Sequence, residues 1–218
     1  CAVVTLRKIE ADERHPSRQM AERLAACLEL NEPEWGRFVA TAVGERPTAG
    51  LSLPAEPSWR RPLNNLPSPV TSLVGRVAEL AAITDCLRHK EVRLLTLTGP
   101  VGVGKTRLAI AASHQLMLAY RHGVCLVALA AVADPQVVPA TTAAVLGIRE
   151  SRDQHLAQTV ANFLAAREML LIFDNFEPLL PAAPFLSALL ASCPNIQLLV
   201  TSHSPLHLYG EHEIAIAP

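Results

Sequence analysis

Apolar runs alternate with helix-like segments along residues 70–218. The runs expected to form strands are mostly apolar, and they cover residues 92–98, 123–130, 169–174, 196–201 and 213–217. Between them, apolar residues at helical spacing predict helices over residues 105–120, 135–147, 153–167 and 177–192. A strand that is apolar on both faces must be covered on both faces, which is typical of a parallel sheet between two layers of helices. The pattern therefore predicts an α/β three-layer sandwich.

The first 45 residues have a different pattern, which predicts a small all-α segment of three short helices. Ser17 follows Pro16 and is placed to cap the second helix. The third helix carries its apolar side chains on one face, namely Trp35, Phe38, Val39 and Ala42. Both helices are amphipathic, and each is expected to need a partner surface.

A proline-rich stretch separates these two parts of the chain. Six prolines fall within it, at positions 47, 54, 57, 62, 67 and 69. Proline lacks a backbone N–H and favours an extended backbone, so this stretch is expected to be a semi-rigid linker. The predicted organisation is a helical segment over residues 1–45, a linker over residues 46–69 and an α/β domain over residues 70–218.

Composition indicates a globular, cytoplasmic protein. Half of the 218 residues are hydrophobic, which is enough to fill the core of one sizeable domain and a small one. The formal net charge is −1, so no whole-chain basic field attracts nucleic acid or a membrane, and any DNA contact must be local. The longest apolar run, residues 124–133, is about half of the roughly 20 residues that a membrane-spanning helix needs. The five widely spaced cysteines argue against a disulfide framework and a zinc site.

One glycine-rich turn carries the chemistry of phosphate binding. It lies between an expected strand and an expected helix and matches the pattern G-x-x-x-x-G-K-[ST], with Gly99, Pro100, Val101, Gly102, Val103, Gly104, Lys105 and Thr106. The glycines let backbone N–H groups approach phosphate oxygens, and the following helix adds its positive dipole end. We expect Lys105 to neutralise the β and γ phosphates, Thr106 to bind Mg²⁺, and the next residue, Arg107, to belong to the nucleotide site. The predicted sandwich is thus of the P-loop NTPase class; a glycine-rich turn without a ligand is the alternative.

An acidic residue ends a later apolar strand. Asp174 follows Leu170-Leu171-Ile172-Phe173 and is expected to face the P-loop, where it holds Mg²⁺ through a water molecule as the Walker B carboxylate. A hydrolytic ATPase also needs a carboxylate nearby to polarise the attacking water, yet Asn175 occupies the adjacent position. Glu177 is the nearest candidate for this base. Its alternative interpretation is an acidic residue in the first turn of a helix, favoured by the helix dipole ahead of Pro178.

Four segments taken together resemble the STAND class of signal-transduction ATPases, and specifically the NB-ARC-like, AAA+-related ATPases of bacterial transcriptional regulators. These segments are residues 73–80, 94–100, 171–177 and 199–206. The resemblance implies a domain that binds ATP or ADP together with Mg²⁺. In the family, a Val-Gly-Arg segment lies against the adenine, which implies base and ribose contacts for Val74, Gly75 and Arg76. The alternative for these three residues is a helix N-terminus with ordinary packing.

The sequence departs from this family at the end of the strand expected over residues 196–201. The family carries an arginine after Thr-Ser that reaches the γ-phosphate, whereas this sequence has His203. Imidazole is shorter than guanidinium and is mostly neutral near pH 7. Sensing of the γ-phosphate and the rate of hydrolysis are therefore both in doubt, and a surface-loop histidine without a role is the alternative.

The start of the sequence resembles the end of a phage-repressor-type helix-turn-helix domain, from its recognition helix onward. The resemblance rests on residues 4–14 and 16–18 and implies that Thr5, Arg7 and Lys8 face the major groove or the phosphates of DNA. The two helices that come first in such a domain are missing from this sequence, so we expect this chain not to bind DNA tightly. A generic helical subdomain is the alternative.

These features predict an ATP-controlled switch with slow hydrolysis in a longer transcriptional regulator. Its nucleotide state would change its packing against downstream helical and repeat domains, the complete N-terminal domain would bind DNA, and nucleotide could also control self-association. No membrane partner is expected. Two other classes stay open: a catalytic P-loop enzyme, either a fast ATPase or a kinase, and a nucleotide-dependent assembly scaffold. No arginine-rich lid segment follows the P-loop helix, which argues against the kinase.

Overall fold

Two compact units make up the chain. The computed structural model describes residues 15–27, 32–45, 62–68, 73, 75–148 and 155–218. The smaller unit lies within Cys1–Arg61 and the larger one is Pro62–Pro218. Each unit has its own buried core and is described by itself.

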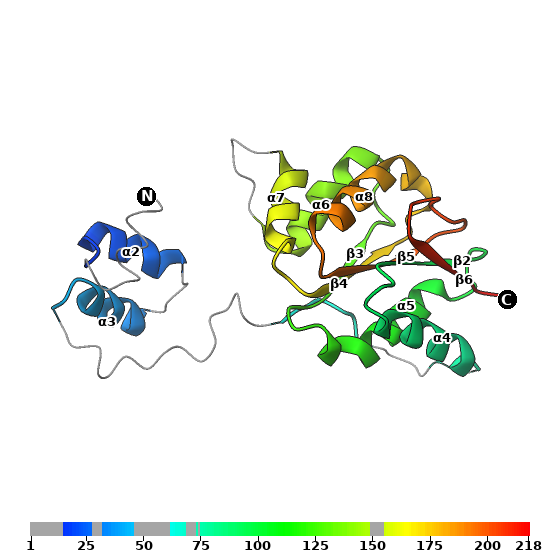
Figure 1. Ribbon diagram of the computed structural model, residues 1–218, viewed down its shortest axis with the longest axis horizontal. Helices are drawn as coiled ribbons and strands as arrows, with labels where there is room; N and C mark the ends of the chain where they lie inside the picture. Colours follow the sequence, from blue (N-terminus) through cyan, green and yellow to red (C-terminus); the bar gives the residue numbers. More distant parts are fainter. Residues whose placement is uncertain (1–14, 28–31, 46–61, 69–72, 74, 149–154) are drawn as a thin grey trace. The chain divides into compact units, whose positions relative to one another are not determined.

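The smaller unit consists of two helices among its described residues, α2 (Arg18–Cys27) and α3 (Glu32–Ala42) (Figure 1). Ser17 stands before α2, and its hydroxyl accepts a hydrogen bond from the Met20 backbone N–H over 3.4 Å. A small apolar core joins the helices, formed by Ala21, Ala25 and Val39 with Trp35, Phe38 and Ala42 against them. The apolar face predicted for the third helix is confirmed. The first expected helix, with Thr5, Arg7 and Lys8, lies outside the described residues.

Within its described residues, the larger unit contains a six-stranded parallel sheet of order β1-β3-β4-β5-β2-β6. The strands are β1 (Leu63–Asn64), β2 (Leu94–Thr98), β3 (Gly123–Ala128), β4 (Met169–Asp174), β5 (Ile196–Thr201) and β6 (Glu211–Ala215). Every residue of β2 and β5 is buried, as the apolar runs in the sequence predict for central strands of a parallel sheet.

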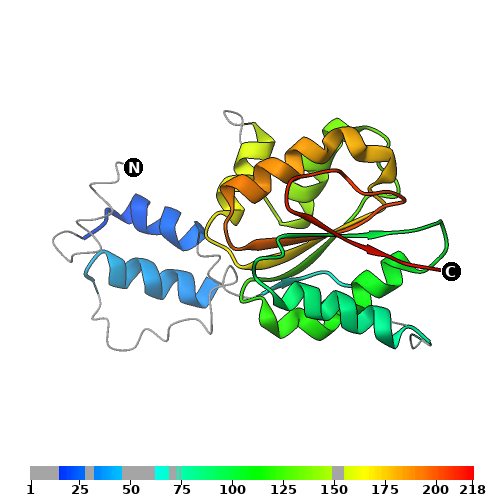
Figure 2. The ribbon, with the colours of Figure 1, turned by 45° about the vertical axis from the view of Figure 1, so that its right-hand side comes forward.

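Helices cover both faces of this sheet (Figures 1 and 2). One face carries α4 (Val77–Arg88) and α5 (Lys105–Leu116), and the other carries α6 (Val138–Val145), α7 (Leu156–Leu164) and α8 (Ala183–Ser192). Short 3-10 helices are η2 (Met117–Ala119), η3 (Pro135–Val137) and η4 (Glu177–Ala182). The α/β three-layer sandwich predicted from the sequence is confirmed. None of the described helices has both the length and the apolar character needed to cross a bilayer.

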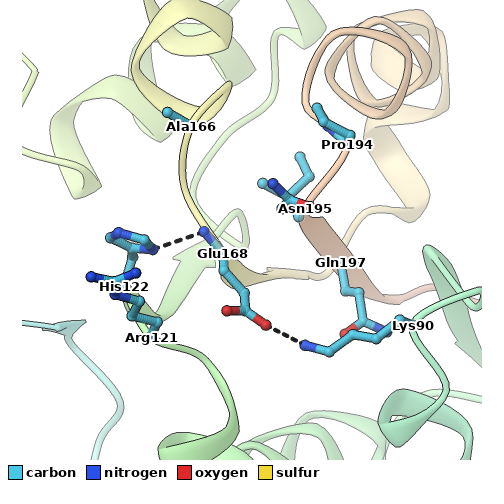
Figure 3. Close-up of a pocket in the computed structure, with 9 residues that line it drawn as sticks. Lys90, Arg121, His122, Ala166, Glu168, Pro194, Asn195 and Gln197 are labelled. Carbon is cyan, nitrogen blue, oxygen red and sulfur yellow. Dashed lines mark hydrogen bonds and ion pairs between the residues drawn. The ribbon is translucent and has the colours of Figure 1, made fainter.

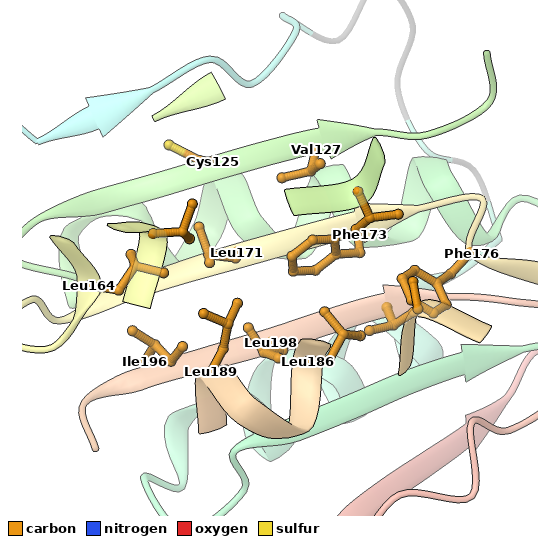
Figure 4. Packing of buried hydrophobic residues seen from close by; sticks show 14 of the residues in the cluster. Cys125, Val127, Leu164, Leu171, Phe173, Phe176, Leu186, Leu189, Ile196 and Leu198 are labelled. Atoms are coloured by element: carbon orange, nitrogen blue, oxygen red, sulfur yellow. The ribbon is translucent and has the colours of Figure 1, made fainter. Parts of the chain in front are cut away.

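Alternate residues of each central strand point into different cores. In β4, Leu171 and Phe173 join the cluster under α6, α7 and α8, which Figure 4 shows, whereas Leu170 and Ile172 join the cluster under α4 and α5. Burial of a side chain of this size contributes about 1.5–3 kcal/mol. Phe173 also meets the ring of Phe176 edge to face, with centroids 6.2 Å apart. The end of β4, where Asp174 stands, is thus anchored on both faces of the sheet.

The last part of the linker expected over residues 46–69 contributes a strand to the sheet. Leu63–Asn64 form the edge strand β1 beside β3. Asn65 extends the pairing with its side-chain amide, which donates to Leu126 O over 2.8 Å and accepts from Leu126 N over 2.6 Å. Gly123 permits the approach of β1, because a Cβ atom there would lie 2.0 Å from Leu63 O. The strand therefore lies inside the proline-rich stretch, after Pro62 and before Pro67.

The helix expected over residues 177–192 is broken into η4 and α8. Three prolines interrupt its first half, Pro178, Pro181 and Pro184. Each removes a backbone N–H donor, and Leu179 between them has a non-helical backbone, with φ −113° and ψ 18°. Regular α-helix therefore begins only at Ala183.

Candidate functional site

The glycine-rich turn connects the carboxyl end of β2 to the first turn of α5. Gly99, Gly102 and Gly104 all have positive φ, at 143°, 79° and 102°. A Cβ atom at Gly99 would lie 2.5 Å from the carbonyl oxygen of Ile216, so the backbone leaves no room for a side chain there. Such a loop, which leads directly into a helix N-terminus, has the form of a phosphate-binding loop.

Lys105 is the first residue of α5, and it lies folded against the loop that precedes it. Its ammonium group donates to Gly99 O over 2.7 Å and to Pro100 O over 3.0 Å. The residue is only 8% exposed, and a lysine this buried needs polar partners. The loop carbonyls therefore hold the positive charge at the place where the phosphate groups of a nucleotide are expected.

Thr106 and Asp174 meet, as the sequence predicts for a P-loop and a Walker B strand. The Thr106 hydroxyl donates to Asp174 Oδ1 over 2.6 Å, although α5 and β4 are far apart in sequence. A third residue joins them, because the Thr201 hydroxyl at the end of β5 also donates to Asp174 Oδ1 over 2.6 Å. Thr201 lies in the segment 199–206 that resembles the family, but the sequence assigned it no role. Its position directly before Ser202 and His203 was the available signal.

The oxygen atoms of Thr106 and Asp174 suit Mg²⁺, which prefers hard oxygen ligands. Among the described residues, no three His, Cys, Asp or Glu side chains gather as a metal site. Two protein oxygens suffice for Mg²⁺ bound to a nucleotide, because this ion retains several waters and takes phosphate oxygens as further ligands. The residues present therefore fit this metal together with a polyphosphate.

Glu177 and His203 lie in contact with each other. His203 Nε2 is 2.9 Å from Glu177 Oε1, and the histidine side chain is 44% exposed, whereas the glutamate side chain is 20% exposed. The other carboxylate oxygen, Glu177 Oε2, is buried without a hydrogen-bond partner among the described residues. A buried carboxylate oxygen normally has a partner, so a water molecule or a ligand group that donates to this atom would complete its hydrogen bonding. The sequence named both residues as candidates but did not predict their contact.

The turn between Asp174 and Glu177 has an unusual backbone. Asn175 has a φ of 68°, in the left-handed region that asparagine tolerates better than most residues. Its N–H donates to Thr201 Oγ1 over 2.9 Å, and Phe176 N donates to Thr201 O, also over 2.9 Å. Thr201 therefore fixes both the Asp174 carboxylate and the turn that presents Glu177.

Arg76 links the start of α4 to the P-loop. Its guanidinium donates to Glu79 Oε1 over 2.7 Å, to Ala217 O over 2.8 Å and to Val103 O over 3.4 Å. The hydrogen bond from Arg76 also lowers the pKa of the Glu79 carboxyl. Arg76 thus lies beside the loop, and its contact with adenine or ribose stays a prediction.

Other residues expected at the nucleotide are Val74 and Gly75, expected at the adenine, and Val101 and Arg107, expected in or next to the P-loop. Gly75 has a φ of 75°, and Val74 lies outside the described residues. Val101 is exposed at the tip of the loop, and Arg107 is exposed on α5. Their roles in nucleotide binding stay predictions.

Similar sequences occur in mycobacteria, while no family model matches the chain. A Mycobacterium tuberculosis protein whose name provisionally describes an HTH-type transcriptional regulator is 39% identical over 120 residues, which is 55% of this chain and 13% of that protein. An uncharacterized protein of the same species is 35% identical over 150 residues, which is 68% of this chain and 38% of that protein. The chain therefore spans well under half the length of these relatives.

Two archaeal structures are also similar. Cdc6p from Pyrobaculum aerophilum has 18% sequence identity and a TM-score of 0.49, over 71% of this chain and 47% of its own. A STAND protein with a tetratricopeptide repeat sensor from Pyrococcus horikoshii has 16% identity and a TM-score of 0.47, over 75% of this chain and 25% of its own. Because both TM-scores are below 0.5, the fold assignment rests on the strand order and loop geometry of this chain itself.

Proposed function

We propose that the Pro62–Pro218 unit is a nucleotide-controlled switch domain, which binds ATP or ADP with Mg²⁺ and hydrolyses ATP slowly. The observation that carries this proposal is the contact between Thr106 and Asp174 over 2.6 Å, directly after a loop whose three glycines have positive φ. Backbone N–H groups of the loop would hold the phosphates, and the Thr106 and Asp174 oxygens would hold Mg²⁺, which neutralises phosphate charge when bound.

Lys105 would change partners when a nucleotide binds. It now donates to the neutral carbonyl oxygens of Gly99 and Pro100. Hydrogen bonds between charged groups are shorter and about twice as strong as neutral ones, so a phosphate oxygen would compete well for the ammonium group. The lysine would move from its own loop to the β and γ phosphates.

The pairing of Glu177 with His203 supports slow hydrolysis. A carboxylate that polarises water must accept a hydrogen bond from that water, and with Oε1 paired to His203 Nε2 only Oε2 is left for it. The same nitrogen cannot contact Glu177 and a γ-phosphate at once. His203 would therefore couple the two events: an ATP γ-phosphate that attracts His203 would free Glu177.

A role in transcriptional regulation is the wider part of the proposal. It is supported by the 39% identity with the mycobacterial protein named as an HTH-type regulator and by the resemblance of the motifs to STAND ATPases. In this role the complete N-terminal domain of a longer chain would bind DNA. Helical and repeat domains further along that chain would respond to the nucleotide.

The test of nucleotide binding is calorimetry on the Lys105→Ala variant. We expect at least a tenfold loss of affinity for Mg²⁺-ATP, because the variant lacks the ammonium group that meets the phosphates and leaves their charge to backbone amides. Lys90→Ala is the matched control, since Lys90 precedes the amino end of β2 rather than its carboxyl end, and its affinity should equal that of the wild type. Unchanged binding by Lys105→Ala would remove the central claim.

The switch, the fast enzyme and the scaffold differ in turnover and mass. Steady-state ATP turnover and light-scattering mass should be measured on the same protein with no nucleotide, with ADP and with ATP. Slow turnover with tight nucleotide binding supports the switch. Rapid turnover would favour an enzyme, and a large mass change without turnover would favour a scaffold.

A further inference from the structure

A hollow lies at the edge of the sheet opposite the P-loop. Because all strand pairs are parallel, the amino ends of β3, β4 and β5 lie at one edge, whereas the P-loop follows a carboxyl end. The hollow has a volume of about 390 Å³ and is lined by polar residues next to these amino ends, among them Lys90, Arg121, His122, Glu168, Asn195 and Gln197 (Figure 3). This volume is within the range of small-molecule sites.

Hydrogen bonds fix the position of Gln197, one of the residues that line the hollow. Gln197 is 3% exposed, and its amide nitrogen donates to Leu87 O, His89 O and Val92 O over 3.1, 3.2 and 2.6 Å. Its side-chain oxygen accepts from the Tyr120 hydroxyl over 2.8 Å. One buried side chain therefore ties β5 to the segments around α4 and β3, and the hollow exists before any ligand arrives.

The wall formed by His122 is fixed to Glu168 in two ways. His122 N donates to Glu168 O over 3.0 Å, and Glu168 N donates to His122 Nδ1 over 2.9 Å. A nitrogen that accepts a hydrogen bond carries no proton, so the proton of the neutral ring must be on Nε2. His122 is therefore held as a hydrogen-bond donor through Nε2.

The charges of the hollow do not balance. Lys90 Nζ lies 2.5 Å from Glu168 Oε1, so these two charges compensate each other, and Figure 3 shows Glu168 between Lys90 and His122. Arg121 is exposed and makes no hydrogen bond or ion pair with the described part of the chain. Within the described parts of the chain, the Arg121 guanidinium and the His122 Nε2–H have no hydrogen-bond partner.

We propose that this hollow binds a small organic carboxylate through Arg121 and His122. Guanidinium presents paired N–H donors that match the two oxygens of a carboxylate, and His122 adds a third donor. Glu168 disfavours a compact anion such as phosphate, whose whole charge would lie on one group beside Glu168, whereas a dicarboxylate can place one carboxylate on Arg121 and keep the other in solvent. This hollow is separate from the nucleotide site. The proposal for the hollow does not depend on the nucleotide-binding function proposed above.

Calorimetry with sodium glutarate on the full 218-residue chain, without nucleotide, tests the proposal. Saturable binding is expected, and Arg121→Gln should weaken it at least tenfold. Arg88→Gln is the matched control, because Arg88 is an exposed arginine at the end of α4 that pairs with Asp85 and does not line the hollow. Its affinity should equal that of the wild type, and an equal loss in both variants would overturn the proposal.

Glu168→Gln supplies a second test, in which the expected result is tighter binding. A folding defect would weaken binding and so could not produce this result. The variant removes the negative charge and frees Lys90 while the backbone bonds of residue 168 to His122 remain, so glutarate should bind several-fold more tightly. Weaker or unchanged binding would contradict the charge argument.

Two further probes establish the chemistry of the ligand. Inorganic phosphate should bind more weakly than glutarate, and glutaramide, which lacks the charge, should not bind. Phosphate that binds as tightly as glutarate would overturn the assignment to a carboxylate. The absence of saturable binding by acetate, glutarate and citrate alike would overturn the site itself.

Discussion

At the scale of single residues, Asp174 is where the two halves of the nucleotide site meet. Its Oδ1 accepts hydrogen bonds from the Thr106 and Thr201 hydroxyl groups, each over 2.6 Å. An asparagine oxygen can accept the same two bonds, so Asp174→Asn should keep the local structure while removing the charge. This separates a structural role of the residue from a role toward the metal.

We predict that Asp174→Asn weakens the binding of ATP in the presence of Mg²⁺ about tenfold or more and leaves the binding of ADP in EDTA nearly unchanged. The reason is that the carboxylate acts on the nucleotide through the metal. Calorimetric titrations with and without Mg²⁺ check this. Asp134→Asn, at the start of η3, is the control, and an equal loss under both conditions would contradict the metal role.

His203 provides the second prediction at this scale. His203→Arg should raise the ratio of ATP to ADP affinity about tenfold, which corresponds to ~1.4 kcal/mol, because the longer cationic side chain can reach a γ-phosphate that ADP lacks. Competition titrations with a fluorescent nucleotide would measure the ratio. His155→Arg, at an exposed position before α7, adds the same charge elsewhere and should leave the ratio unchanged. A ratio that is the same in wild type, His203→Ala and His203→Arg would show that His203 is a loop residue without a sensing role.

At the scale of elements, the turn from β4 into η4 depends on the left-handed backbone of Asn175. We predict that Asn175→Val lowers the free energy of unfolding by about 1–2 kcal/mol, because a β-branched residue is strained at positive φ. Asn175→Gly should stay near the wild type, since glycine adopts this backbone freely. Urea unfolding followed by far-UV circular dichroism measures both. If the two variants lose the same stability, the side chain of Asn175 and not its backbone is what matters.

The central elements could be predicted because their local pattern and their environment agree. β4 and β5 begin and end where the apolar runs do, since strands buried on both faces tolerate few polar residues. The edges could not be predicted so well. β1 is only two residues long and depends on the side chain of Asn65, and β6 begins at Glu211 rather than at residue 213. Edge positions are decided by the neighbouring strand, which a single sequence does not show.

The candidate site likewise has features that the sequence predicted and features that it did not. The P-loop and Asp174 were predictable because each lies at the carboxyl end of a strand in one parallel sheet, where such ends must converge. The contact between Glu177 and His203 was not, because it requires that β4 and β5 be neighbours. Thr201 was missed for the same reason, since its hydroxyl reaches Asp174 across that strand pair.

At the scale of the whole molecule, the positions of the tryptophans allow the two units to be followed separately. The chain has two of them, Trp35 and Trp59, and both precede residue 62. Trp35 packs in the small core of α2 and α3. Tryptophan fluorescence therefore reports on the part of the chain before Pro62, and Trp59→Phe leaves Trp35 as the reporter of the α2–α3 core, while most of the far-UV circular dichroism comes from the larger unit.

We predict that a nucleotide stabilises only the Pro62–Pro218 unit. At a Mg²⁺-ATP concentration of 100 times the dissociation constant, binding adds about 2.7 kcal/mol to the stability of the unit that binds. For a domain of this size, this raises the midpoint of the thermal transition by roughly 5–10 °C. The circular dichroism transition should shift by that amount while the tryptophan transition stays in place, since the residues expected to bind nucleotide all lie after residue 62.

Lys105→Ala supplies the control for this experiment, because it should lose the nucleotide-dependent shift and keep the unfolding transitions of the nucleotide-free wild type. The comparison also tests the independence of the two units. A tryptophan transition that moves together with the circular dichroism signal in the wild type, and stays in place in Lys105→Ala, would mean that the helical unit unfolds cooperatively with the nucleotide-binding unit. In that case the nucleotide state would already reach the amino-terminal segment within these 218 residues, without the downstream domains that the proposed switch otherwise requires.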